Sequence, residues 1–308
     1  MIADAVLAGL PLVRLTDGTG RVLAAVSPRA ASLRSLTVRG LDIVEPFVTE
    51  PDAPGMAGAT LVPWPNRVED AIWWHNGHRH ELAMTEPELG HANHGLLAGD
   101  DFAVLSRDET SATLGAEIRQ PQGYPFDLDV AVGYVVTDSG ITVTTSVENR
   151  GTEPAPVALG AHPYLRIGSA SIDELVVSVQ ATHAYRLDDR HIPRERFAVA
   201  GTPWDLTVPR RIADSPAHAT FEQESAAGVL VHSLHEPNGD RVELWADDDY
   251  RFTQLYIARE LPSDTGPRLA VAIEPMTAPP NALRTGEGLR WLAPDERWCT
   301  SWGVRLAT

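Results

Sequence analysis

The sequence predicts an all-β protein, a large antiparallel sandwich or barrel made of many short strands. Short apolar and β-branched runs recur along the 308 residues, and turn residues separate them, with 24 glycines and 24 prolines in the chain. No segment shows the long 3.6-residue apolar period of an amphipathic helix. Many short strands joined by turns are typical of sandwiches and barrels. Because there is no linker and no internal repeat, we expect one domain over residues 1–308, as large β-sandwiches often exceed about 200 residues.

Hairpins account for the opening part of the chain. An apolar run at 12–15, the turn at 17–20 and a second run at 21–26 predict the first hairpin. Another hairpin is expected at 72–80, around the turn Asn76-Gly77. The other predicted strands are 31–38, 41–44, 112–118, 130–136, 141–147, 175–179, 228–234, 241–245, 252–257 and 298–306.

The composition excludes several partners and sites. A formal charge of −17 at pH 7 disfavours binding to nucleic acid and to anionic membranes, although a locally basic pocket for an anionic small molecule remains compatible with it. The single cysteine, Cys299, excludes an internal disulfide framework and a cysteine-based metal site. The N-terminal segment carries Asp4 in place of a basic region and has no long apolar core. We therefore expect no signal peptide, no transmembrane helix and a cytoplasmic location.

A rigid turn is predicted where Trp64 stands between two prolines, because that arrangement is incompatible with a central strand or a helix interior. The turn presents Trp64, Asn66 and Arg67. A tryptophan beside an arginine suits a sugar ring, whose CH faces stack on aromatic rings while its hydroxyls need polar partners. The structural alternatives are a core tryptophan and an arginine in a surface ion pair.

Glu274 follows the apolar run 269–273, and Pro275 is expected to end that strand. His162 has the same setting, because a short apolar run reaches it and Pro163 follows. A buried carboxylate is either paired or used in chemistry, since burying an unpaired charge is costly. The structural alternatives are a glutamate that caps a loop and a satisfied core histidine.

Other histidines carry weaker signals. His94 precedes a glycine in a loop-like segment and is either a turn residue or part of a site. His75, His78 and His80 lie on the Asn-Gly hairpin, where their spacing without a carboxylate beside them is poor metal geometry, so a solvated hairpin end is the preferred interpretation. The sequence contains no phosphate-binding glycine loop, no Gly-x-Ser-x-Gly elbow and no zinc spacing. We expect neither a metal nor a cofactor.

Five motifs in order resemble the aldose 1-epimerase (galactose mutarotase) family. They are Pro63–Arg67, Asn93–Leu96, Gly160–Tyr164, Phe252–Tyr256 and Glu274–Asn281, followed by the ending Glu296–Gly303. The resemblance covers nearly the whole chain and is more specific to the superfamily than to one sugar. It implies a large antiparallel β-sandwich of the galactose mutarotase-like supersandwich type, with the site in a cleft across one face.

The resemblance also implies roles for individual residues. Glu274 is the expected general base, which takes the proton from the anomeric hydroxyl, and His162 is the expected general acid, which protonates the ring oxygen. His94 is expected to hydrogen-bond the ring oxygen or an adjacent hydroxyl. The residues expected to bind the sugar are Arg67, Asn66, Trp64, His218 and Gln254. With ordinary pKa values of about 4.3 and 6.5, Glu is ionised near neutral pH, and His donates a proton there if the nearby carboxylate raises its pKa.

One position departs from the family pattern. Relatives carry an aspartate that holds sugar hydroxyls before the late strands, and His218 occupies the position that we align with it. Asp214 and Asp205 are the candidates to replace that aspartate. A cationic His218 beside Arg67 would tolerate a phosphorylated, sulfonated or carboxylated sugar better than a neutral-sugar site does.

Two functions of different classes follow from these residues. The first is an aldose 1-epimerase that interconverts the α and β anomers of an aldohexose or a derivative by opening and closing the ring. The second is a protein that binds a carbohydrate without converting it. A matched acid and base favour the enzyme, because binding alone needs neither. The sequence determines neither the sugar nor the oligomeric state.

Overall fold

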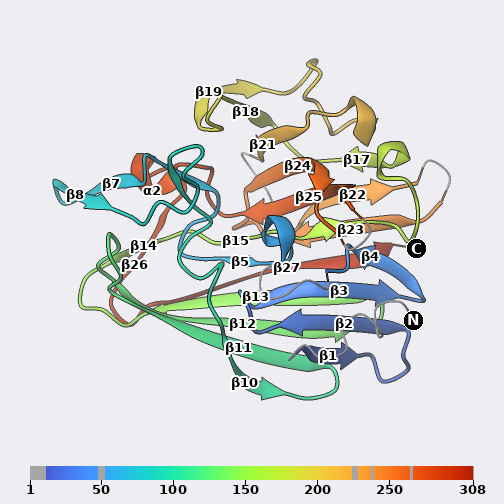
Figure 1. Cartoon of the computed structure of the whole chain (residues 1–308), viewed down its shortest axis with the longest axis horizontal. Coiled ribbons are helices and arrows are strands. Elements are labelled where there is room, and N and C mark those ends of the chain that lie inside the picture. The colour runs from blue at the N-terminus through green and yellow to red at the C-terminus, as the bar shows by residue number, and fades with distance from the viewer. Residues whose placement is uncertain (1–11, 48–52, 224–227, 237–238, 264–265, 308) are drawn as a thin grey trace.

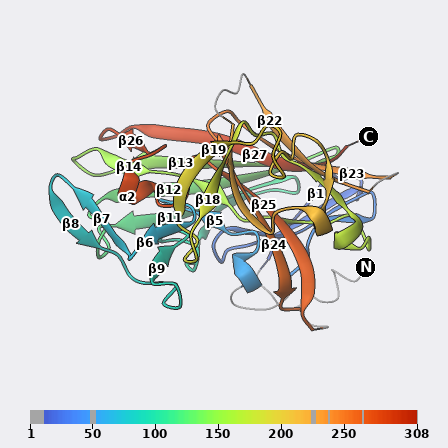
Figure 2. The same cartoon turned by 90° about the horizontal axis from the view of Figure 1, so that it is seen from above.

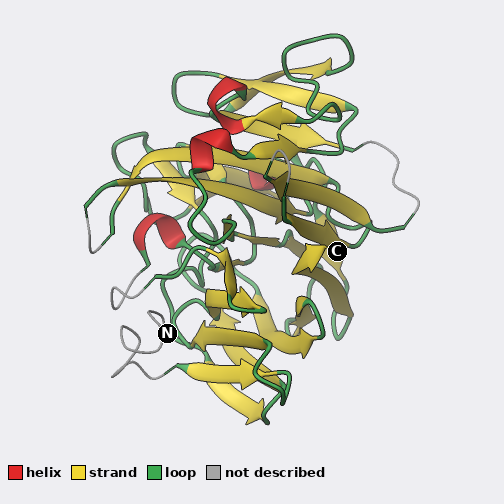
Figure 3. Ribbon diagram, turned by 90° about the vertical axis from the view of Figure 1, so that its right-hand side faces the viewer, coloured by secondary structure: helices red, strands yellow, loops and turns green. Residues whose placement is uncertain are grey.

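The computed structural model describes residues 12–47, 53–223, 228–236, 239–263 and 266–307, and almost all of this ribbon is strand or loop (Figure 3). The helical segments are α2 (Ala282–Thr285) and three 3-10 turns, η1 (Pro54–Met56), η2 (Ile172–Glu174) and η3 (Ile212–Asp214). Among the described residues, no helix has the length and apolarity needed to span a bilayer. The all-β class predicted from the sequence is confirmed.

The larger sheet contains twelve strands, and its ladders are antiparallel. Its order is β1 (Val13–Thr16), β2 (Val22–Ser27), β3 (Ser32–Val38), β4 (Leu41–Val44), β16 (Tyr164–Leu165), β25 (Arg268–Met276), β24 (Phe252–Leu261), β21 (His218–Glu222), β18 (His183–Leu187) and β19 (Pro193–Ala198). Off this path, β15 (Gly160–Ala161) pairs with β25 and with β5 (Thr60–Leu61).

The second sheet contains nine strands. Its order is β10 (Ala103–Arg107), β11 (Ser111–Arg119), β12 (Asp127–Thr137), β13 (Gly140–Asn149), β27 (Arg297–Ala307), β23 (Arg241–Ala246), β22 (Leu230–His235), β17 (Val176–Ser178) and β20 (Arg210–Arg211). Three further pairs are β6 (Arg67–Glu69) with β9 (His91–Asn93), β7 (Ile72–His75) with β8 (His78–Glu81), and β14 (Ala155–Val157) with β26 (Arg290–Leu292). In both Figure 1 and Figure 2, β7, β8 and α2 gather at one end of the molecule, away from β24 and β25.

The core is built from alternating faces of the strands. In β12, every second residue is buried from Leu128 to Val136, while the residues between them are more exposed. This period of two is that of a strand with one face on the core. A single apolar cluster contains residues of both large sheets, from Val13 of β1 to Leu306 of β27. Packing between the sheets therefore holds β24 and β25 in place.

The predicted strands agree with the structure except at one functional boundary. The hairpins β1–β2 and β7–β8 form as expected. The strand expected to end at Glu274 continues through Pro275 to Met276. It continues because its neighbour changes there from β16 to β15, whose Gly160 pairs with Met276. Glu274 therefore lies inside a strand that is paired on both sides, in a more rigid setting than a loop.

Replacement of Gly95 by alanine tests how closely the chain packs around His94. Gly95 and Gly77 have the same φ of +78°, but a Cβ on Gly95 would lie 2.2 Å from the carbonyl oxygen of Val62, whereas one on Gly77 would meet nothing within 4 Å. We expect Gly77→Ala to lower the free energy of unfolding by about 1 kcal/mol through strain alone. Gly95→Ala should lower it by about 2–4 kcal/mol, because the backbone must also move. Denaturant unfolding measures both, and equal losses would contradict the close contact.

Candidate active site

The antiparallel register of the larger sheet brings His162 opposite Glu274. The register is set by two flanking pairs, each two residues away from them along the chain: Gly160–Met276 and Tyr164–Ala272. Residues opposite each other on neighbouring strands project from the same face. Nε2 of His162 lies 3.4 Å from Oε1 of Glu274. Two residues more than 100 positions apart in the sequence thus form a carboxyl–imidazole pair.

Backbone and ring contacts orient the His162 side chain. The backbone N–H of His162 donates to the carbonyl of Ala59 (3.0 Å), and its carbonyl accepts from the N–H of Gly58 (2.8 Å). The imidazole stacks on the ring of Tyr164, with centroids 5.1 Å apart and planes inclined at 26°. Turning the imidazole away from Glu274 would break this stack.

Burial determines the protonation of the pair. Glu274 is 2% exposed and His162 is 5% exposed. Desolvation raises the pKa of Glu274 to about 8, partly opposed by the charge of Arg67. Desolvation also lowers the pKa of His162 to about 4. This corrects the expectation of an ionised Glu274 and a His162 with a raised pKa, because burial disfavours both charges more than their proximity favours them. Between these pKa values the pair carries one titratable proton, which is on the Glu274 carboxyl.

Several polar atoms of this cluster have no protein partner. Within the described part of the chain, Oε2 of Glu274, Nδ1 of His162 and the hydroxyl of Tyr164 are buried without a hydrogen bond. The great majority of buried polar atoms in proteins are hydrogen-bonded, because an unmade bond is costly. Such atoms gathered in one place indicate groups that are available to a ligand.

Asn66 fixes His94 next to this pair. The backbone N–H of Asn66 donates to Nδ1 of His94 (3.2 Å), and the backbone N–H of His94 donates to the carbonyl of Asn66 (3.0 Å). The rings of His94 and His162 meet edge to face, with centroids 5.3 Å apart. Burial holds the pKa of His94 well below its ordinary value. Because Nδ1 accepts a hydrogen bond, the neutral ring carries its proton on Nε2, and His94 offers a donor there.

His94, His162 and Glu274 together carry the types of atom that bind metal ions. Their ligand atoms lie within 4.8 Å of one another, and two histidines with a carboxylate can hold zinc or non-haem iron. A metal-bound histidine normally donates a hydrogen bond from its second nitrogen to a carbonyl or carboxylate. In His94 the second nitrogen instead accepts from the N–H of Asn66. The proton is then on Nε2, which has no lone pair for a metal, so the arrangement fits hydrogen bonding better than metal binding.

Arg67 is oriented by Glu86, a residue that no sequence pattern had marked. Nε and Nη2 of Arg67 donate to the two carboxylate oxygens of Glu86 at 2.7 and 2.8 Å. This bidentate geometry is strong and directional. The backbone N–H of Arg67 donates to Oδ1 of Asn66 (2.9 Å). The rigid turn therefore brings Asn66 and Arg67 together as expected, but Arg67 already has a carboxylate partner.

Two of the predicted sugar-binding residues are engaged elsewhere. Trp64 is 1% exposed and packs in the main core against Tyr124, with centroids 6.1 Å apart, so the expectation of a stacking surface is wrong. Gln254 pairs with Glu274 in register, but its side chain is used within the protein. Its Oε1 accepts from the hydroxyl of Thr220 (2.6 Å), and its Nε2 donates to the carbonyl of Leu255 (3.2 Å).

His218 lies next to the site but is not a cation. It pairs with Tyr256 in register, and the two rings meet with centroids 5.4 Å apart. Burial, together with the charge of neighbouring groups that include Arg67, lowers the pKa of His218 to about 3. The ring is therefore neutral at pH 7, contrary to the cationic role expected from the sequence. Of the proposed replacements for the missing aspartate, Asp205 accepts a hydrogen bond from Thr207, and Asp214 is exposed in η3.

A second histidine, His191, accompanies His218 and was not marked by the sequence. Their ring centroids are 4.4 Å apart. His191 lies in the turn between β18 and β19, far from the other site residues along the chain, and no local pattern distinguishes it. By contrast, the hairpin histidines belong to another region: the ring of His75 stacks on Trp291, with centroids 5.4 Å apart.

Comparison with solved structures first defines the class of protein. A GalM/aldose epimerase homologue from C. elegans superposes with a TM-score of 0.83 at 18% identity, covering 96% of this chain and 98% of that one. A galactose 1-epimerase from Lactobacillus acidophilus superposes with a TM-score of 0.78 at 16% identity, covering 96% of this chain and 94% of that one. The fold is the galactose mutarotase-like β-sandwich.

Sequence comparison then defines the family. The family model for aldose 1-epimerase matches residues 11–303. The uncharacterized protein YihR of Escherichia coli K12 is 31% identical over 257 residues, which cover 83% of this chain and 81% of YihR. The chain belongs to the aldose 1-epimerase family.

The protonation of the buried pair can be observed directly by NMR on protein labelled at glutamate carboxyls and histidine rings. We expect the Glu274 carboxyl to titrate near pH 8 and to be protonated below it, because burial favours the neutral form. The rings of His162 and His218 should stay neutral down to about pH 4 and 3. Glu274→Gln and His218→Asn assign the signals. Titration of the carboxyl near 4.5, or of these rings near 6.5, would contradict the desolvated site.

Proposed function

We propose that the protein is an aldose 1-epimerase that interconverts the α and β anomers of an aldohexose. One observation carries the proposal: a buried carboxyl and imidazole lie 3.4 Å apart, and each has a polar atom without a protein partner. Anomerisation requires one proton to leave the anomeric hydroxyl and another to reach the ring oxygen. A pair that exchanges a single proton supplies both transfers without a cofactor.

In the proposed reaction, the proton of the pair first moves from Glu274 to His162 when the sugar binds, so that Glu274 acts as the base and His162 as the acid. Glu274 takes the proton of the anomeric hydroxyl, the bond from C1 to the ring oxygen breaks, and its electron pair stays on that oxygen, which takes a proton from His162. Rotation about C1–C2 turns the other face of the aldehyde to the hydroxyl, and the reverse transfers close the ring. A sugar hydroxyl that donates to Oε2 of Glu274 stabilises the carboxylate form and so prepares the base.

The surrounding groups are proposed to hold the sugar. His94 offers Nε2–H as a donor to the ring oxygen or a neighbouring hydroxyl, as its hydrogen bond with Asn66 supports. The Arg67 guanidinium, fixed by Glu86, and the side-chain amide of Asn66 are proposed to bind further hydroxyls. Donors held in place before the sugar arrives cost little to organise during the reaction.

A neutral sugar fits these groups better than an anionic one. The anionic alternative rested on a cationic His218, whose pKa of about 3 leaves it neutral at pH 7. Arg67 is already paired with Glu86 at 2.7 Å. Polarimetry or NMR of freshly dissolved sugars, with neutral and anionic members in the panel, tests this preference. Binding without acceleration for every sugar would support the non-catalytic carbohydrate-binding protein instead.

Replacement of Glu274 by glutamine separates catalysis from folding. Gln is close in shape to the protonated carboxyl, so Glu274→Gln should fold with little change in stability. Its acceleration of anomerisation should fall by roughly 10²–10⁴-fold, because the proton acceptor is lost. The rate is measured by polarimetry after subtraction of the buffer-catalysed rate, and a retained rate would refute the assignment of the base.

Glu45 provides the matched control for that variant. It is also buried, but Arg166 and Arg268 lie 2.9 and 2.7 Å from its Oε1. Glu45→Gln should therefore lower stability, because it weakens a buried ion pair. The folded fraction should keep its activity. If only Glu274 takes part in catalysis, Glu274→Gln should lose activity and keep its stability, whereas Glu45→Gln should lose stability and keep its activity.

The pH dependence of kcat/KM should follow the single proton of the pair. Above about pH 8 the proton is lost, and below about pH 4 a second proton is added, so activity should be highest between these values. Burial determines the direction in which each limit of the profile is displaced, because it raises the pKa of Glu274 and lowers that of His162. A profile measured from pH 3.5 to 9.5 in low-catalysis buffers should be bell-shaped. A fall between pH 6 and 7 would show that an ordinary histidine controls the rate.

A further inference from the structure

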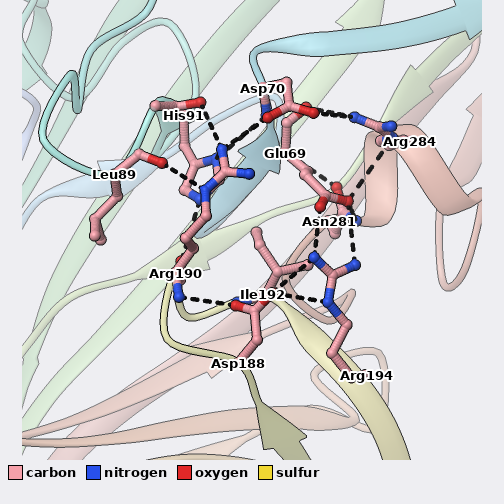
Figure 4. A network of polar contacts seen from close by, with 11 residues as sticks. Glu69, Asp70, Leu89, His91, Asp188, Arg190, Ile192, Arg194, Asn281 and Arg284 are labelled. Carbon is pink, nitrogen blue, oxygen red and sulfur yellow. Dashed lines mark hydrogen bonds and ion pairs between the residues drawn. The ribbon is translucent and has the colours of Figure 1, made fainter.

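The turn between β18 and β19 is fastened to the strand that begins with Arg67. Arg190 donates to Asp70 (2.7 Å) and to the carbonyl of Leu89 (3.0 Å), and Arg194 donates to Glu69 (2.5 Å). Figure 4 shows these contacts near the end of β6, where Arg284 of α2 also donates to Asp70. The turn is thus fixed to the same element that positions Arg67.

The turn is also closed internally, by hydrogen bonds on either side of its middle residue. Oδ1 of Asp188 accepts from the backbone N–H groups of Arg190 and Ile192 at 2.9 and 3.0 Å, and Ile192 is fully buried. His191 lies between these two anchored residues, with a left-handed φ of 64°. A left-handed φ is uncommon outside glycine, although histidine is among the residues that adopt it more readily.

His191 and His218 form a pair of neutral rings beside the catalytic cluster. Their centroids are 4.4 Å apart, and desolvation lowers the pKa of both. The charges that act on His191 include those of Arg67 and Glu86, while those that act on His218 include His162 and Arg67. Neither imidazole forms a hydrogen bond with any residue that the structure describes. Two rings whose nitrogens have no hydrogen-bond partner among the described residues therefore lie within electrostatic range of Arg67.

We propose that His191 is a sugar-contacting residue and that, with His218, it determines which hydroxyl configuration the site accepts. The inference rests on the proposed function and deepens it. A neutral imidazole has one donor and one acceptor nitrogen, and a sugar hydroxyl also both donates and accepts. A carboxylate at the same place would only accept. The pair therefore suits a neutral, hydroxyl-rich sugar, and Arg194 acts as a positioning residue that holds the turn.

The test pairs a change in the protein with a change in the sugar. Wild type, His191→Phe and His191→Asn are assayed with an accepted aldohexose and its monodeoxy analogues. Removal of the contacted hydroxyl should lower kcat/KM of the wild type about tenfold, and His191→Phe should lower it about tenfold for the parent sugar, mainly through KM. We call the fall in kcat/KM on removal of one hydroxyl the deoxy penalty. In His191→Phe the deoxy penalty at the contacted hydroxyl should nearly vanish, because the two changes remove the same contact. An undiminished penalty at every position would overturn the proposal.

Two further variants separate contact from structure. His78→Phe, on the exposed end of the β7–β8 hairpin, should leave every deoxy penalty unchanged. Arg194→Ala should raise KM as His191→Phe does, and the double variant should lose little more, because both act on one contact. Additive losses would overturn the positioning role. His191→Asn tolerates the left-handed backbone and covers the case in which His191→Phe does not fold.

The failure of this inference can be told apart from the failure of the proposed function. If the wild type accelerates anomerisation but the deoxy penalties do not depend on residue 191, only the inference fails. If the wild type accelerates anomerisation of no sugar, the proposed function fails and the inference falls with it.

Discussion

The site depends on the register between β25 and the segment that contains β15 and β16. That register alone places His162 opposite Glu274, because the two residues are far apart in the chain. A shift by one residue would move one of the two side chains to the other face of the sheet. Close packing on both faces of β25 resists such a shift, since large buried side chains such as Ile273 would have to exchange places with small ones such as Ala272. Core packing thus specifies the geometry of the acid–base pair.

The same burial that fixes the pair also determines its chemistry. In water a carboxylate and an imidazole would differ in pKa by about two units, with the carboxylate the stronger acid. In this site desolvation reverses the order, to about 8 for Glu274 and about 4 for His162. One proton then belongs to the pair over the whole neutral range. A shared proton suits a reaction that adds one proton and removes another at neighbouring oxygens, with no net change.

Local patterns in the sequence predicted most strands, because turn chemistry and alternation are local properties. The same signal, an apolar run followed by proline, marked both Glu274 and His162. Whether Trp64 faces the core is decided by what packs on it, here Tyr124, and the sequence does not contain that information. The charge of His218 depends on burial in the same way. Glu86 and His191 were missed because only tertiary contacts connect them with Arg67 and His218.

The sheet and the turns carry different residues of the candidate site, and this difference has a physical reason. Glu274 lies inside β25, which is paired on both sides, and His162 lies between β15 and β16, which both pair with β25. Three of the groups around this pair, Asn66, His94 and His191, lie outside the strands and have φ between 57° and 64°. Left-handed residues such as these allow the chain to change direction within a short distance. Under the proposed function, substitution in such a turn would change which sugar hydroxyls are bound while Glu274 keeps its place in β25, so sugar preference can change while the proton transfers stay the same.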